Sequence, residues 1–439
     1  MSDRSFAPPR LKALSARRSA TICVLDIGTT KIACLIGRLA PIEGGELLRG
    51  RTHRCQVLGI GVQRARGIKG GVVVDMEEAE DAIRHAVDAA ERMAKLQVES
   101  LIVNLSGGRL ASQRHNARIA LSGAPVGDAE IHRAVEAAAC YPSDPARSVL
   151  HSLPTGFSLD GATAVREPKG MVGTELGAQL HVVSCDSAAV RNTMLAVERC
   201  HLEIEAVVAS PYAAGLSVLV DDEIEMGTIV VDLGGGTTSV ASFAGGRLEY
   251  SDSVAVGGNH VSMDIARGLT LRLGDAERLK THYGACQATL ADERETISIS
   301  QIGEDSAPPM QLPKAHLVRI IKPRVEEILE LVRDRLAANG YAAHGGHRVV
   351  LTGGASLMPG MSETARRILS NQVRIGRPLG VQGLPESAKS PAFAASVGLL
   401  VYPQAAGLER FEPQRSRITL ATGTDGYIGR VGRWLRDSF

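Results

Sequence analysis

Aromatic side chains, clustered cysteines and an excess of charge of either sign are all scarce in this sequence. Aromatic residues make up 3% of the 439 positions, with a single tryptophan. The 49 Lys and Arg residues nearly balance the 48 Asp and Glu residues, and the net charge of +1 gives no reason to propose nucleic-acid binding. The seven cysteines are odd in number and never spaced as CxxC. They suggest neither a disulfide framework nor a zinc site, and a reducing compartment fits best.

Long apolar runs are also missing. No stretch of about 18 consecutive apolar residues occurs, so no membrane-spanning helix is expected. The first residues are basic and contain no apolar run, which excludes a secretory signal. We interpret residues 1–19 as a disordered basic tail, with a transit peptide as the less favoured alternative. The rest of the chain has ordinary globular composition, with 44% hydrophobic and 22% charged residues, and is long enough for two or more domains.

The sequence lacks the common short motifs for phosphate binding and hydrolysis. It contains no GxxxxGK[ST] loop, and Gly59 and Gly61 are followed by Arg64 where a dinucleotide fingerprint requires glycine. Neither a GxSxG nucleophile elbow nor an HExxH zinc motif occurs. The twelve histidines have no paired metal spacing, so we interpret them as scattered core and surface residues.

An internal repeat is present instead. Residues 21–31 read TICVLDIGTTK and residues 228–238 read TIVVDLGGGTT, at an offset of 206 positions (232 minus 26). Each is a buried-type strand that ends in an Asp and a Gly/Thr turn. A third strand, RVVLTGGAS at residues 348–356, also runs into glycines. Helical patterns at 76–94 and about 317–338 alternate with these strands, which predicts an α/β architecture with two similar lobes.

The two repeated turns predict a clamp for a polyphosphate. Glycine lets backbone N–H groups approach an anion, and Thr hydroxyls and the Lys31 ammonium add donors. Asp26 and Asp232, one at the end of each strand, are then expected to hold Mg²⁺ through its waters. The alternative is that each motif is only a strand followed by a tight turn. Because the motif occurs twice, phosphate binding is the favoured interpretation. The predicted phosphate-side residues are Asp26, Gly28, Thr29, Thr30, Lys31, Asp232, Gly234, Gly235, Gly236, Thr237, Thr238, Gly353, Gly354 and Ser356.

The order of these turns resembles the superfamily of actin, heat-shock chaperones and sugar kinases. Within it, three stretches resemble the FtsA family of bacterial division proteins: Gly71 to Asp75 with the helix that follows, Pro168 to Gly173, and Ser210 to Ala214. The resemblance covers roughly residues 20–402 and 427–439 and implies a bilobal actin-like ATPase fold of duplicated ribonuclease H-like lobes, with an FtsA-type subdomain inserted in the first lobe. It also implies binding of ATP with Mg²⁺.

The same resemblance implies a division of the chain into domains. We expect first-lobe core at 20–97 and 183–205, the inserted subdomain at 98–182, the second lobe at 206–375 with an outer subdomain at 246–325, and a return to the first lobe at 376–402. Residues 403–426, rich in Pro, Gly, Gln, Arg and Thr, are interpreted as a linker.

Further site residues come from the resemblance. Gly257, Gly258 and Asn259 are expected near phosphate, and Glu277 and Lys280 beside the nucleoside, although a solvated helix face would explain the last pair equally well. Ser210 stands before Pro211 where heat-shock chaperones place a catalytic Glu. Because a hydroxyl is a poor general base at neutral pH, at most slow ATPase activity is expected, and no catalytic residue is assigned.

The C-terminus, residues 427–439, predicts an amphipathic helix that lies on a membrane. At about 100° per residue its apolar side chains fill an arc of roughly 140° and its arginines flank them. A helix docked on the protein's own core is the alternative. The predicted membrane-binding residues are Tyr427, Ile428, Arg430, Val431, Arg433, Trp434, Leu435, Arg436 and Phe439.

These features favour an FtsA-like scaffold on the cytoplasmic face of the bacterial inner membrane, at the division site. The resemblance implies actin-like self-assembly, anchoring of filaments through the C-terminal tail of FtsZ, recruitment of later division proteins, and contact with anionic phospholipid. A metabolite kinase with the same ATP clamp is the alternative. Such an enzyme would need a catalytic carboxylate, and none can be assigned from the sequence. A chaperone ATPase would need a substrate-binding module after the second lobe.

Overall fold

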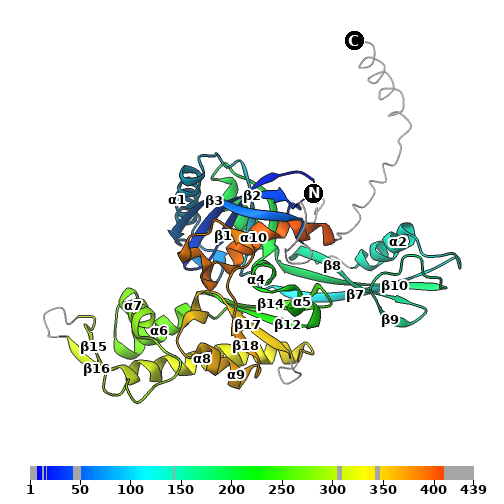
Figure 1. Ribbon diagram of the computed structural model, residues 1–439. Coiled ribbons are helices and arrows are strands. Elements are labelled where there is room, and N and C mark those ends of the chain that lie inside the picture. Colours follow the sequence, from blue (N-terminus) through cyan, green and yellow to red (C-terminus); the bar gives the residue numbers. More distant parts are fainter. Residues whose placement is uncertain are drawn as a thin grey trace, which may run out of the picture.

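Two sheets with the same strand pattern form the two lobes of the chain (Figure 1). The computed structural model describes residues 7–11, 14–15, 17–42, 51–141, 144–303, 309–341 and 347–409. The first-lobe sheet has the order β11-β6-β1-β2-β3-β19. Its strands are β1 (Ala20–Ile27), β2 (Lys31–Pro41), β3 (His53–Arg64), β6 (Ser100–Leu105), β11 (Glu203–Ala209) and β19 (Val381–Gln382).

The second-lobe sheet repeats this arrangement in the order β14-β13-β12-β17-β18. Its strands are β12 (Thr228–Leu233), β13 (Thr238–Ala244), β14 (Arg247–Val254), β17 (Arg348–Thr352) and β18 (Val373–Ile375). In each lobe three strands form an antiparallel meander, and its first strand then pairs in parallel with a later one. The predicted two-lobed α/β fold is confirmed, and the sequence repeat corresponds to β1 and β12.

Helices cover both sheets because their apolar positions recur with helical spacing. The first-lobe and connecting helices are α1 (Met76–Ala94), α3 (Ser187–Glu198), α4 (Ser210–Val218), α5 (Asp221–Met226) and α10 (Ala394–Ala405). Those of the second lobe are α6 (Gly258–Leu269), α7 (Leu273–Tyr283), α8 (Lys314–Ala338) and α9 (Met361–Ile368). The helix predicted at 76–94 is α1, and the one predicted at about 317–338 is α8, which begins three residues earlier.

Helix α1 illustrates how local sequence sets these boundaries. The Asp75 side chain accepts a hydrogen bond of 3.1 Å from the backbone N–H of Glu78, which caps the helix N-terminus. Lys95 ends the helix in the left-handed region at φ 56°. Its buried face is rich in alanine, and Gly59 and Gly61 of β3 lie against it so closely that a Cβ atom at Gly61 would approach the Ala86 carbonyl oxygen to 1.9 Å. Small residues on both sides therefore fix the tight contact between helix and sheet.

Helices α4 and α10 cross at the centre of the molecule. Gly398 of α10 packs so close to α4 that a Cβ atom there would lie 1.7 Å from the Ala213 carbonyl oxygen. The surrounding core cluster contains side chains of both lobes, among them Val24 and Phe243. Residues Pro391–Leu408 are long and apolar enough to cross a membrane by length and composition, but 61% of this stretch is buried within the fold. Its packing is that of a core helix.

The inserted subdomain is a four-stranded sheet of order β7-β10-β8-β9 with α2 (Asp128–Ala139) against it. Its strands are β7 (Ala111–Ala120), β8 (Arg147–Leu159), β9 (Ala162–Val165) and β10 (Glu175–Asp186). It projects from the first lobe and lies beside β14 of the second (Figure 1). The minor elements of the fold are β4 (Ile68–Lys69), β5 (Val72–Val73), β15 (Thr296–Ile299), β16 (Met310–Pro313), η1 (Gly354–Leu357), η2 (Glu386–Lys389), η3 (Pro391–Phe393) and η4 (Ala406–Leu408).

Several predicted domain boundaries differ from the strand pairings. The insertion was expected from 98 and the second lobe from 206, but β6 and β11 are both strands of the first-lobe sheet. The outer subdomain was expected at 246–325, yet β14 belongs to the second-lobe sheet and α8 continues to Ala338. Parallel pairing joins distant segments, so these strands could not be assigned to a lobe from their own sequences.

Both ends of the fold are also more structured than expected. In the segment predicted as a disordered tail, Leu11 and Leu14 pack against the central core cluster. The linker predicted from 403 begins too early, because α10 runs to Ala405 with Pro403 buried, and η4 follows. The predicted membrane helix 427–439 and linker residues 410–426 lie outside the described residues.

Candidate functional site

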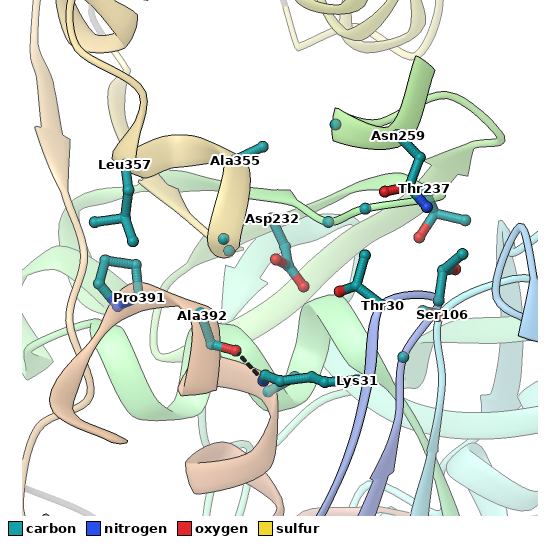
Figure 2. A pocket seen from close by; sticks show the side chains of 18 of the residues that line it. Thr30, Lys31, Ser106, Asp232, Thr237, Asn259, Ala355, Leu357, Pro391 and Ala392 are labelled. Atoms are coloured by element: carbon teal, nitrogen blue, oxygen red, sulfur yellow. Dashed lines mark hydrogen bonds between the residues drawn. The ribbon is translucent and has the colours of Figure 1, made fainter. Parts of the chain in front are cut away.

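A cavity of about 350 Å³ lies between the two lobes, at the ends of β1 and β12 (Figure 2). The repeated turns form its floor, and segments from α6, α7, η1 and η3 complete the wall. It brings together most of the residues predicted from sequence: Asp26, Gly28, Thr29, Thr30, Lys31, Asp232, Gly234, Gly235, Thr237, Gly258, Asn259, Glu277, Lys280, Gly353 and Gly354.

The two repeated turns touch each other across the lobes. A Cβ atom at Gly235 would lie 2.3 Å from a methyl carbon of Thr30, and one at Gly236 would lie 2.5 Å from the Thr29 hydroxyl oxygen. Within each turn the first glycine N–H donates back to a carbonyl, from Gly28 to Lys31 and from Gly234 to Thr237, each at 3.0 Å. Glycine is therefore required here for the close approach of the lobes.

Asp26 is held at the base of the cavity by side chains from two other elements. Its Oδ1 accepts a hydrogen bond of 2.6 Å from the Asn104 amide of β6, and its Oδ2 accepts one from the Ser396 hydroxyl of α10. The same Asn104 amide donates to the Ser210 hydroxyl at 3.0 Å. The Oδ1 of Asn104 accepts a hydrogen bond of 2.7 Å from the Ile27 N–H. The Asp26 carboxylate is thus fixed in one orientation before any ligand binds.

Asp232 is the more weakly compensated of the two carboxylates. Burial at the cavity base raises its pKa to about 7, the nearby Asp26 carboxylate adds to the rise, and Lys31 opposes it. Figure 2 shows its carboxylate directed into the cavity. Gly353, at φ 83°, leaves room for it, because a Cβ atom there would lie 2.4 Å from its Oδ1. An acid whose charged form lacks compensation is suited to a site that receives a cation.

These two carboxylates fit a Mg²⁺ ion held mainly through water and phosphate. Within the described residues no group of three or more His, Cys, Asp or Glu side chains is placed to bind a metal directly. Mg²⁺ usually takes one or two protein carboxylates and keeps several waters, so Asp26 and Asp232 are sufficient. The ion would neutralise phosphate charge there.

The Lys31 ammonium is held by the η3 segment. Its Nζ donates a hydrogen bond of 2.5 Å to the Ala392 carbonyl of η3 and lies 3.9 Å from the centre of the Phe393 ring (Figure 2). Burial lowers its pKa, while the charges of Asp26 and Asp232 oppose that shift. A buried ammonium with one carbonyl partner has donors left for an anion in the cavity.

The outer wall is tied together by the predicted pair on α7. Lys280 Nζ donates to Glu277 Oε2 at 2.7 Å and to the Gly258 carbonyl at 3.0 Å, and the Ser262 hydroxyl also donates to Glu277. Both α7 side chains line the cavity. They also join α7 to the start of α6, and their contact with a nucleoside stays a prediction.

Comparison with known proteins decides the family. The family model described as "Cell division protein FtsA" matches residues 229–398 of this chain. The model described as "SHS2 domain inserted in FTSA" matches residues 107–184. The chain is 50% identical to cell division protein FtsA of Agrobacterium fabrum over 99% of this chain and 98% of the relative, and 32% identical to that of Escherichia coli K12 over 94% and 97%. The chain belongs to the FtsA family of cell division proteins.

Solved structures agree on the fold. The PilM-PilN type IV pilus biogenesis complex gives a TM-score of 0.58 at 16% identity, covering 88% of this chain and 99% of that one. MreB 5 of Spiroplasma citri bound to AMPPNP gives 0.50 at 15% identity, covering 88% and 97%. The inserted sheet of this FtsA-family chain coincides with the SHS2 match, which begins at 107 rather than at the predicted 98.

Four predicted residues do not line the cavity. Gly236 packs on Thr29, the Thr238 hydroxyl donates to the Val256 carbonyl at 2.8 Å, and the Ser356 hydroxyl donates to the Gly353 carbonyl at 2.7 Å. Gly257 lies under the second turn. The backbone N–H groups of Gly258 and Asn259 are also engaged, by the carbonyls of Gly234 and Gly235. These residues shape the turns, and their own polar groups are already paired.

Sequence reasoning missed part of the lining. Asn104 and Ser106 come from the end of β6, and a second group, which includes Ala355, Leu357 and Pro391, forms an apolar edge (Figure 2). The lining residues outside the predicted set are Asn104, Ser106, Ser210, Thr281, Ala355, Leu357, Met358, Pro359, Pro391, Ala392 and Ala395. One signal in the sequence could have identified Asn104 as a lining residue: it is a polar residue near the end of a strand that pairs in parallel with β1.

Proposed function

We propose that this chain is an ATP-binding division protein whose bound Mg·ATP closes the two lobes into a form that self-assembles. The observation that carries the proposal is the cavity between two copies of one Asp-Gly-Thr turn, with a carboxylate from each lobe at its base. Phosphates bound there would contact both turns at once. A ligand biases such an equilibrium only through contacts that differ between open and closed forms, and a two-lobed clamp provides them.

The surroundings of the cavity support ATP in particular. The turns and Lys31 offer donors to phosphate, while Leu357 and Met358 give an apolar edge on which a base can lie. A neighbour in fold, MreB 5 of Spiroplasma citri, was solved bound to AMPPNP. Asp26 and Asp232 would hold Mg²⁺ through water.

Hydrolysis in this site is expected to be slow. Ser210 occupies the position where a water-activating carboxylate would be needed, and its hydroxyl oxygen already accepts a hydrogen bond from Asn104. A hydroxyl is a poor general base at neutral pH, and an occupied lone pair weakens it further. The protein therefore acts as a nucleotide-gated scaffold.

The partners follow from the FtsA family. We propose that the outer part of the second lobe, predicted at 246–325, binds the short C-terminal tail of FtsZ, and that filaments of this chain recruit later membrane proteins of the divisome. The C-terminal helix 427–439 would hold the assembly on anionic phospholipid at the cytoplasmic face of the inner membrane, at the division site. Titration with a tail peptide tests the second-lobe surface, and absence of saturable binding would contradict it.

The kinase alternative lacks its catalytic acid. The acidic side chains in the cavity lining are Asp26, Asp232 and Glu277. The first two are assigned to Mg²⁺, and Glu277 is engaged by Lys280 and Ser262. Failure to phosphorylate a panel of sugars and organic acids is therefore expected.

Co-sedimentation with anionic liposomes, with and without Mg·ATP, tests the proposal as a whole. Assembly multiplies the number of membrane helices per particle, so binding should rise steeply with nucleotide and with protein concentration. Equal sedimentation in both conditions, with ATP shown to be bound, would remove the nucleotide gate.

A further inference from the structure

The end of the first lobe that is farthest from the cavity carries a group of arginines, Arg17, Arg18, Arg38 and Arg54, here called the basic pole. Strand β1 runs from this pole, at Ala20, to the cavity, at Asp26. All four arginines are exposed. The ion pairs of the described residues involve none of them, although many other arginines of the chain are paired.

Strand register places two of these arginines, Arg38 and Arg54, on one face of the sheet. Arg38 of β2 lies opposite Gln56 of β3, and Arg54 lies opposite Ala40. Side chains two positions apart share a face, so Arg38 and Arg54 are diagonal neighbours with Cα atoms about 7–8 Å apart. The Arg18 carbonyl oxygen lies 3.0 Å from Nε2 of His53, the residue before Arg54. This contact holds the turn at Arg17 and Arg18 beside the start of β3, on the side of the sheet opposite to Arg54, because neighbouring side chains of a strand point to opposite faces.

Among the described residues, the acidic side chains of this end lie to one side. Glu99 precedes β6 and Glu203 begins β11, and both are exposed. The sheet order β11-β6-β1-β2-β3 puts β1 between them and the arginines. The described residues of the pole over β2 and β3 are therefore positively charged, even though the net charge of the chain is only +1.

The end of helix α10 lies at the same pole, and the described chain then continues to Glu409, which is buried against His151 of β8. Helix α10 ends at Ala405, and Gln404 Oε1 accepts hydrogen bonds of 3.0 Å from the N–H groups of Thr52 and His53. Residues 410–426 follow before the predicted membrane helix, and at 3.3–3.6 Å per residue they span at most about 60 Å. This reach from Glu409 is long enough for the pole to meet a bilayer in which a helix at 427–439 is seated.

We propose that the basic pole is a second membrane contact, which binds the headgroups of anionic phospholipids once the C-terminal helix has inserted. The inference rests on the proposed membrane attachment. Arginine forms bidentate hydrogen bonds with phosphate, and anionic leaflets attract basic surfaces within a Debye length. With the pole on the membrane, β1 points away from the bilayer and the cavity and second lobe face the cytoplasm, where FtsZ would be reached.

Vesicle binding by the full chain tests the contact. The double variant Arg38→Ser/Arg54→Ser is compared with Arg267→Ser/Arg319→Ser, which removes the same charge from exposed positions of the second lobe. On vesicles of phosphatidylcholine with phosphatidylglycerol, at low salt, the pole variant should bind about fivefold more weakly per arginine removed. The difference should fade at high salt, and the second-lobe variant should bind like the wild type. Melting temperature and ATP affinity of both variants should be unchanged, because none of these arginines lines the cavity.

Two results would overturn the proposal. One is that the pole variant binds vesicles as strongly as the wild type. The proposal also fails if this variant binds vesicles normally but no longer binds an acidic protein partner. The other is an equal loss in both variants, which would reflect net charge alone. A parallel measurement on Trp434→Glu separates this proposal from membrane attachment itself: if that variant still binds, the helix assignment fails, whatever the arginines do.

Discussion

Asp232 is the residue at which nucleotide binding can be tested most sharply. We expect Asp232→Ala to lower Mg·ATP affinity by a factor of about 30, since hydrogen bonds to charged groups contribute about 2 kcal/mol. Isothermal calorimetry measures this directly. Asp222→Ala, at an exposed position outside the cavity, is the matched control. An unchanged affinity in Asp232→Ala would remove this aspartate from the site.

The same substitution should not weaken the ligand-free fold. The pKa of Asp232 is about 7 in the folded chain and near 3.8 when unfolded, so its contribution to stability is full below pH 3.8 and is lost as pH rises through 7. Above pH 7 the buried charge opposes folding. Its removal therefore separates loss of binding from loss of structure.

At the residue scale, the sequence predicted what local pattern encodes and missed what tertiary contacts supply. Asp26 and Asp232 were found because each ends an apolar strand before a Gly/Thr turn. Asn104 and Ser396, which orient Asp26, were not, because their positions have meaning only once β6 and α10 lie beside β1. Ser356 was wrongly placed in the lining, since its hydroxyl closes its own turn.

At the scale of elements, the crossing of α4 and α10 should tolerate no side chain. Gly398→Ala would force a methyl group to within 1.7 Å of the Ala213 carbonyl oxygen, and a backbone atom cannot rotate away. We expect unfolding free energy to fall by about 3 kcal/mol, the upper end of overpacking costs. Urea denaturation measures the loss.

Gly274→Ala is the control for that experiment. This glycine lies in α7, and a Cβ atom there meets nothing within 4 Å. Replacing a helical glycine by alanine is expected to raise stability by up to about 1 kcal/mol. A loss in Gly274→Ala comparable to that in Gly398→Ala would contradict the packing argument.

The contact between the inserted subdomain and the second lobe should be sensitive to acid. His181 of β10 is fully buried, with Nδ1 3.1 Å from the Leu248 carbonyl oxygen and Nε2 2.9 Å from the Ser112 hydroxyl. Burial lowers its pKa to about 4, and the charge of Arg114 adds to the shift. Because the unfolded chain binds this proton near pH 6.5, stability is expected to fall as pH drops from about 6.5 to about 4, by up to about 3 kcal/mol.

His181→Gln should flatten that pH dependence while keeping an amide donor for Leu248. Thermal melting at a series of pH values checks it, with His132→Gln as control because His132 is an exposed residue of α2. If the slope persisted in His181→Gln, other groups would have to account for it.

The domain boundaries show where prediction from sequence stops at this scale. Helix α1 was predicted to the residue, because capping and periodicity are local properties. Strands β6 and β11 were assigned to the wrong units, because a short apolar strand does not reveal the sheet that it joins. Parallel pairing across long sequence separations decides that, and only the assembled fold displays it.

At the scale of the whole molecule, the structure separates two ends of one rigid strand. The cavity lies at the last residues of β1, and the basic pole lies at its first residues. We propose that nucleotide binds between the lobes, while the far pole of the first lobe contacts the membrane. The two activities can then be removed independently by mutation.

The C-terminal helix supplies the sharpest test of that separation. Trp434, the single tryptophan, lies with Ile428, Val431 and Leu435 on one predicted face of 427–439, a segment outside the described residues. Burying a large apolar side chain contributes about 1.5–3 kcal/mol, and each nearby arginine about 1 kcal/mol on an anionic surface. Ordering the segment costs about 1–2 kcal/mol per residue, so a single helix should bind weakly and an assembly strongly. Trp434→Glu is therefore expected to abolish liposome and inner-membrane binding and to leave ATP affinity at the wild-type value. Retention of this variant on membranes would show that attachment does not depend on the helix.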